Sequence, residues 1–224
     1  MPDLNEFHEL VKKGNLDAVR AGLAENPALL NQTNASGQCA FLLAKYYRQE
    51  AVANYLLDQK PQLDIFSLTV AGHSAPVVAE LERRPELLAA HSSDGWTPLH
   101  LAAFFGWPEL AAVLIDRGAD IEARSTNPSG NTPLHAAAAG GHVGVVKLLL
   151  ERGANVNARQ QGGGWTPLHS AAQSGNRAMV EELAAHGADL NARADNNQSP
   201  LDLALTAGKQ DTVALLEALG ARLQ

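Results

Sequence analysis

The chain has 224 residues, of which 46% are hydrophobic and 18% are charged, and its formal net charge at pH 7 is −7. A single cysteine, Cys39, excludes an internal disulfide framework and a cysteine-based zinc site. The acidic balance and the scattered basic residues argue against nucleic acid as a partner. Because residues 1–10 lack the apolar core of a signal peptide and no apolar run is long enough to span a membrane, we expect a cytoplasmic protein without a membrane partner.

Seven pairs of short helices are predicted along the chain, each pair divided by a dipeptide at which the first helix stops. In chain order these dipeptides are Gly14-Asn15, Arg48-Gln49, Gly72-His73, Gly106-Trp107, Gly141-His142, Gly175-Asn176 and Gly208-Lys209. Their spacings are 34, 24, 34, 35, 34 and 33 residues, so one interval is short. We therefore expect one domain, 1–224, built from units over residues 1–34, 35–60, 61–91, 92–126, 127–160, 161–193 and 194–224.

The first three units carry the pattern in a weak form. The first, roughly Asn5 to Ala24, is expected to be an N-terminal cap. In the second, Cys39 stands where later units have threonine. The third arrives about nine residues early, which predicts a lost hairpin over 58–64 and helices over 64–71 and 75–84.

The last four units open with nearly the same phrase, Thr-Pro-Leu-His or, in the last unit, Ser-Pro-Leu-Asp. It begins at Thr97, Thr132, Thr166 and Ser199. A threonine or serine caps a helix by accepting a hydrogen bond from a free backbone N–H, and proline fits the first helical turn. The glycines that follow each helix, such as Gly106 and Gly118, suit the turns that end it.

The period and the phrase resemble the ankyrin repeat, a β-turn plus two helices with T-P-L-H-x-A at its head. The chain is similar to stand-alone bacterial ankyrin-repeat proteins. This resemblance implies an all-α solenoid with short β-hairpin fingers. It also implies a non-catalytic scaffold that binds a partner protein through the fingers and the concave face of the first helices. We expect a monomer without a cofactor.

In that family the residue before the threonine and the two after the alanine pair most often contact a partner. The positions singled out here on that basis are Tyr46, Tyr47, Trp96, Phe104, Phe105, Asn131, Trp165 and Gln173. Large apolar side chains are costly to expose and are enriched at interface hot spots. For Trp96 and Trp165, packing on the neighbouring finger is an equal alternative. The longer fingers over 125–130 and 160–164 are insertions, which in repeat proteins often lie on the binding face.

Two other patterns in the chain could indicate a metal site or a phosphate-binding loop. His100, His135 and His169 occupy equivalent places in units stacked about 10 Å apart, which is too far for one zinc ion with ~2.1 Å bonds, so we expect no metal site and a structural role. Gly162 to Gly164 lack the lysine and the serine or threonine of a phosphate-binding loop. The alternative function is a small-molecule sensor with an aromatic notch near the third unit, between Tyr46-Tyr47 and Trp96-Phe104-Phe105. An enzyme ranks third, and no catalytic residue is expected.

Overall fold

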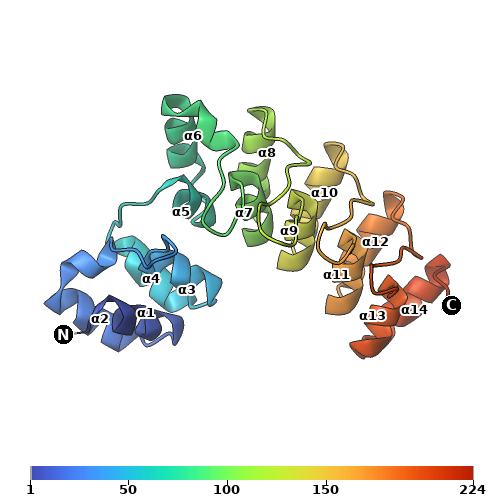
Figure 1. Ribbon diagram of the computed structural model, residues 1–224, viewed down its shortest axis with the longest axis horizontal. Coiled ribbons are helices and arrows are strands. Elements are labelled where there is room, and N and C mark those ends of the chain that lie inside the picture. Colours follow the sequence, from blue (N-terminus) through green and yellow to red (C-terminus); the bar gives the residue numbers. More distant parts are fainter. Residues whose placement is uncertain (1, 224) are drawn as a thin grey trace. The chain divides into compact units, whose positions relative to one another are not determined.

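The computed structural model describes residues 2–223. The described chain folds into fourteen α-helices and two short 3-10 helices, and its one β-pairing is an isolated bridge between Thr33 and Cys39. The expected all-α class is therefore confirmed. The chain divides into two compact units, Met1–Ala71 and Gly72–Gln224, and each is described by itself (Figure 1). Within residues 2–223, no helix combines the length and the apolar character needed to cross a lipid bilayer.

The first compact unit, residues 1–71, contains five α-helices and one 3-10 helix. Below, 'first unit' and 'second unit' mean the two compact units, and the seven shorter segments are called repeats. The helices of the first unit are α1 (Leu4–Lys12), α2 (Leu16–Glu25), η1 (Pro27–Leu30), α3 (Ala40–Tyr46), α4 (Glu50–Asp58) and α5 (Ile65–Val70). Only six residues, 59–64, lie between α4 and α5, and the predicted loss of a hairpin here is confirmed. In the second unit, sixteen residues (117–132) connect α8 to α9.

Two helices of the first compact unit are capped by aspartate and not by the threonine of the repeated phrase. The Asp3 carboxylate accepts a hydrogen bond from the backbone N–H of Glu6 (2.9 Å), and Asp64 accepts one from Ser67 (2.8 Å). The threonine-proline pair is absent from the first three repeats, but α1 and α5 are nevertheless capped, because aspartate takes the place of threonine. Helix α3 is not capped in this way, since its first turn receives no side-chain hydrogen bond from Cys39.

The second unit stacks helix pairs in two rows. Its elements are α6 (Ser74–Arg83), η2 (Pro85–Leu88), α7 (Pro98–Phe105), α8 (Pro108–Asp116), α9 (Pro133–Gly140), α10 (Val143–Glu151), α11 (Pro167–Ser174), α12 (Arg177–Ala185), α13 (Pro200–Thr206) and α14 (Gln210–Leu219). The first-helix row consists of α7, α9, α11 and α13, each packed against the next (Figure 1). The second-helix row, α8, α10, α12 and α14, packs in the same way.

The two rows pack on leucine and alanine. Leu99, Leu134 and Leu168 of the repeated phrase are almost fully buried, and so are the alanine pairs that follow them. Small residues let the first helices approach closely. Gly140 is the clearest case, because a Cβ atom there would lie 2.3 Å from the backbone oxygen of Phe104. The first helix α7 then ends as predicted at Gly106, whose φ of 78° is in the left-handed region that favours glycine.

The segments that connect the helix pairs, which we call fingers, are simpler than expected. In five fingers of the described chain, one backbone hydrogen bond of 2.8–3.0 Å joins the two ends of the turn: from Asn34 to Gln38, Ser92 to Trp96, Ser125 to Asn131, Gln160 to Trp165, and Ala194 to Gln198. No finger of residues 2–223 contains a β-strand. The expected β-hairpins are therefore tight turns, because one cross-turn bond does not make a strand pair.

Candidate functional site

A histidine of the repeated phrase ties each of three repeats to the next. In the first of them, the Thr97 hydroxyl lies 2.8 Å from Nδ1 of His100, and Nε2 of His100 lies 2.9 Å from the carbonyl oxygen of Asn131. The same contacts recur at His135, whose Nε2 is 3.0 Å from the Trp165 carbonyl, and at His169. The backbone N–H of each capping threonine donates to Nδ1, so Nε2 carries the proton and donates to the carbonyl.

These imidazoles are neutral because they are buried. Burial lowers the pKa of His100 and of His135 to about 4, and it lowers the pKa of His169 as well. Both ring nitrogens of each histidine already have a protein partner. The predicted structural role of the three histidines is therefore confirmed, and their side chains are almost fully buried.

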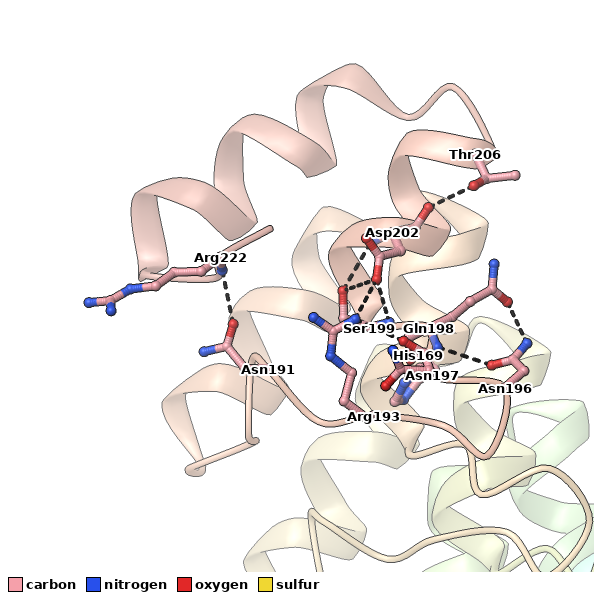
Figure 2. Close-up of polar contacts among 10 residues, drawn as sticks. All are labelled: His169, Asn191, Arg193, Asn196, Asn197, Gln198, Ser199, Asp202, Thr206 and Arg222. Carbon is pink, nitrogen blue, oxygen red and sulfur yellow. Dashed lines mark hydrogen bonds and ion pairs between the residues drawn. The ribbon is translucent and has the colours of Figure 1, made fainter. Parts of the chain in front are cut away.

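In the last repeat, residues 194–224, Asp202 stands at the position of the histidine (Figure 2). Its Oδ2 accepts hydrogen bonds of 2.8 Å from the backbone N–H of Ser199, the Ser199 hydroxyl and the Arg193 guanidinium. Burial raises the pKa of the Asp202 carboxyl, but the Ser199 hydrogen bonds and the Arg193 charge outweigh it, so the pKa lies below its ordinary value. This carboxylate is charged at neutral pH, and it is held by Ser199 of its own repeat and by Arg193 at the end of the preceding one.

An arginine ladder along the fingers is a feature that the sequence reasoning missed. Arg124 donates to the backbone carbonyls of Gly130 (2.9 Å) and of Arg159 (2.6 Å). Arg159 in turn donates to the carbonyl of Arg193, and Arg193 to that of Asn197 (2.8 Å). The available signal was periodicity, since these arginines recur after 35 and 34 residues.

The enlarged fingers are tied to their neighbours. The N–H of Thr126 donates to Gly95 (2.9 Å), that of Gln161 to Ser129 (3.0 Å), and that of Asp195 to Gly163 (3.0 Å), in each case to the backbone oxygen. Because the arginine ladder and these bonds act together, the fingers form one hydrogen-bonded edge along the second unit.

Three of the predicted contact residues form an aromatic cluster at the start of the first-helix row. The rings of Trp96 and Phe104 meet edge to face with centroids 5.0 Å apart, and Phe104 meets Phe105 in the same way at 5.2 Å. All three side chains are half-buried. The cluster is therefore a partly shielded surface patch, more compact than three fully exposed rings.

The two predicted tyrosines lie in the first unit, at the end of α3. Tyr47 is 52% exposed, and the ammonium nitrogen of Lys12 lies 5.6 Å from its ring centroid. Tyr46 is half-buried. Because they belong to a different compact unit from the aromatic cluster, the notch expected between the two groups stays a prediction.

A groove between α9 and α11 brings two further predicted residues together. It has a volume of about 520 Å³, within the range of ligand-sized pockets. Its walls are Ala138, Ala139, Gln160, Gly162, Trp165, Ser170, Gln173 and Ser174. Asn131 is not part of it. That residue acts through its backbone, which accepts from His100 and donates to the Ser125 hydroxyl (2.8 Å).

Comparison with known proteins agrees with this architecture. The family model described as "Ankyrin repeats (3 copies)" matches residues 68–160 and 159–224. The chain is also similar to protein phosphatase 1 regulatory subunit 27 of Mus musculus, with 37% identity over 83 residues, which cover 33% of this chain and 53% of the mouse protein. The match thus spans about half the length of that relative. Because the family model matches well over half of the chain, this protein belongs to the ankyrin-repeat family.

Proposed function

We propose that this protein is a non-catalytic scaffold that binds a partner protein through the first-helix row and the adjoining fingers of its second unit. The observation that carries the proposal is the aromatic cluster of Trp96, Phe104 and Phe105. Trp96 precedes α7, and Phe104 and Phe105 are its last residues. All three rings are half-buried, whereas buried core positions of the same row are filled by leucine and alanine. Clustered aromatic side chains at a surface are the usual anchors of protein interfaces.

The comparisons support a binding role at a general level. Ankyrin repeats generally mediate contacts between proteins, and the name of the mouse relative describes a regulatory subunit of a phosphatase. A regulatory subunit acts by binding another protein, which agrees with a scaffold. No phosphatase is assigned to this chain, because the match covers one third of it.

The proposal also covers the further residues that contact the partner and the state in which the protein acts. The residues proposed to contact the partner also include Trp165, Asn131 and Gln173, and, in the compact unit of residues 1–71, Tyr46 and Tyr47. The protein works as a cytoplasmic monomer, needs no cofactor and binds no nucleic acid. We also propose that it is related to stand-alone bacterial ankyrin-repeat proteins.

The test is a capture experiment with the full chain as bait in an extract of the organism that encodes it. The double variant Tyr47→Ala with Phe105→Ala is compared with the wild type and with Glu181→Ala, a control on the exposed face of α12. We expect a protein that the wild type and the control retain, and that the double variant binds about tenfold more weakly or worse.

Melting temperatures separate binding from folding in this experiment. Tyr47 is half-exposed, and Phe105 is half-buried and packs edge-on against Phe104, so a loss of about 1 kcal/mol, or ~2–4 °C, is expected. A double variant that binds as tightly as the wild type would place the partner elsewhere. One that melts far lower would show that the rings serve folding.

A further inference from the structure

The groove between α9 and α11 is lined without a single charged side chain. Its eight residues are alanine, glycine, serine, glutamine and tryptophan, in a chain of which 18% is charged. The neighbouring helices of the row continue this character with Phe104, Phe105, Leu205 and Thr206. Asp202 is a charged residue of the row, and it is held by Ser199 and Arg193.

The second-helix row shows the opposite composition. Its half-buried and exposed positions carry acidic and basic side chains, among them Glu109, Asp116, Lys147, Glu151, Arg177, Glu181, Glu182, Asp211 and Glu217. Several of these pair with one another, as Lys147 does with Glu151 at 3.9 Å. Charge is therefore segregated to one row of helices, and the groove belongs to the other.

Trp165 gives the groove a rigid anchor. Its indole stacks against the imidazole of His169, with ring centroids 6.0 Å apart and planes 25° apart. Its backbone carbonyl accepts the hydrogen bond from His135, and it also accepts one from the N–H of Gln160 (2.8 Å). A half-buried aromatic side chain that is already held in place loses little conformational entropy when a partner covers it.

The polar side chains of the groove match the backbone of an extended peptide. The amides of Gln160 and Gln173 each offer two donor hydrogens and an acceptor oxygen. The Ser174 hydroxyl donates to the Ala171 carbonyl (3.0 Å), so its oxygen remains an acceptor. Ala138, Ala139 and Gly162 have small side chains or none, which lets a peptide backbone approach these groups closely.

A charged side chain fits this groove poorly. Once a partner covers the groove, a carboxylate or ammonium group there would lose its water without gaining an opposite charge, which is costly. An uncharged side chain avoids that cost, and an apolar one gains contact with the indole of Trp165. The uncharged lining of the groove therefore favours an occupant without charged side chains.

We propose that this groove binds an extended, uncharged segment of a partner protein, with an apolar side chain or a proline on Trp165 and the peptide backbone on Gln160 and Gln173. This inference rests on the proposed function, because it names the kind of segment that the scaffold recognises. Binding of such a segment is expected to depend little on ionic strength, since no ion pair contributes.

The test uses a displayed library of random peptides, selected on the full-length protein. Enriched peptides are then measured by calorimetry against the wild type, Trp165→Ala, Gln173→Arg and the α12 control Glu181→Arg. Gln173 is exposed, so its replacement leaves folding intact even if Trp165→Ala does not. We expect enriched peptides with an uncharged core and an affinity that changes less than about twofold between ~50 mM and ~500 mM NaCl. Gln173→Arg should weaken binding about tenfold and Glu181→Arg should not.

Two other results would each refute a different part. In the first, the enriched peptides share a charged residue, lose affinity about tenfold or more in high salt, and bind the groove variants more weakly than the wild type. This result would refute the proposal that the segment is uncharged, but it would still support a scaffold that binds a partner. If no peptide is enriched, or if the enriched peptides bind the groove variants as well as the wild type, this groove is not the recognition site. The inference then fails, whereas the proposed function, which rests on the aromatic cluster, is decided separately by the capture experiment.

Discussion

The Nε2 atom of His135 lies 3.0 Å from the backbone carbonyl oxygen of Trp165, thirty residues further along the chain. This bond joins the first turn of α9 to the residue that precedes α11. Trp165 lies in the proposed groove, so the same contact that connects two repeats also positions the binding anchor. Stability and recognition therefore share one backbone position but use different side chains.

Replacing His135 with alanine is expected to destabilise the protein without removing its ability to bind. The change removes the imidazole partner of the buried Thr132 hydroxyl, takes away one of the two hydrogen bonds that the Trp165 carbonyl accepts, and opens a cavity. The free energy of unfolding should fall by about 2 kcal/mol or more. Urea denaturation measures it, with His186→Ala, at a partly exposed residue, as the control. If the two variants are equally stable, the histidine bonds do not hold the repeats together.

Stability is expected to fall as the pH decreases from about 6.5 to about 4. The pKa values of His100 and His135 are lowered to about 4 by burial, whereas an unfolded histidine titrates near 6.5. Between these values the unfolded chain binds more protons, so each histidine costs about 1.4 kcal/mol of stability per pH unit. His8 acts in the same direction, because burial first and Lys12 second lower its pKa.

The measurement is the urea midpoint across this pH range. The variant His135→Gln keeps a side-chain donor and loses the titrating group, so its stability should depend less steeply on pH. Carboxylates with lowered pKa values, such as Asp202, lose their contribution only at lower pH, below about 4. A flat profile between pH 4 and 6.5 would contradict the prediction.

The first three repeats are expected to open before the last four. In the first three repeats, helix α3 lacks a side-chain cap, and both ring nitrogens of the buried His8 lack a hydrogen-bond partner among the described residues. The second unit has the histidine bonds and the arginine ladder. Hydrogen exchange should therefore be faster for amides between Asn5 and Arg84 than for those between Leu99 and Leu183. The reverse order would show that these inter-repeat bonds do not set local stability.

Arg48→Gly is expected to stabilise the first unit. Arg48 has a φ of 56°, at the position where six other repeats have glycine, and a side chain in this left-handed region is strained by about 1 kcal/mol. Thermal unfolding measures the gain, and Arg48→Ala serves as the control because alanine keeps the strain. A glycine variant that melts no higher than the alanine variant would contradict the strain proposed at this position.

The helices and their ends were predictable because local rules decide them. The phrase that starts at Thr132 specifies the cap, the first turn and the buried leucine within a few residues, and Gly141 marks the end of the same helix. The short third repeat was predictable from spacing alone. The aspartate caps were missed because Asp3 and Asp64 lie outside the phrase, although aspartate caps a helix as well as threonine does.

The long-range features of the site were harder to predict. Arg124 and Arg159 look like solvated surface charges in the sequence, and only the fold brings each one to a carbonyl of the next finger. The edge-to-face packing of Phe104 likewise depends on ring orientation. The groove could not be predicted because it requires α9, α11 and a finger to meet around Trp165.

The arginine ladder has a consequence for how such a chain changes in length. Each guanidinium reaches a backbone carbonyl, which every residue possesses, and it reaches no further than the next finger. If residues 127–160 were duplicated in tandem, Arg159 of the first copy would meet the carbonyl of Arg159 in the second copy, and Arg159 of the second copy would meet the carbonyl of Arg193. Genes for such a protein can therefore gain or lose whole repeats, and a binding surface can lengthen, without a new joint having to evolve.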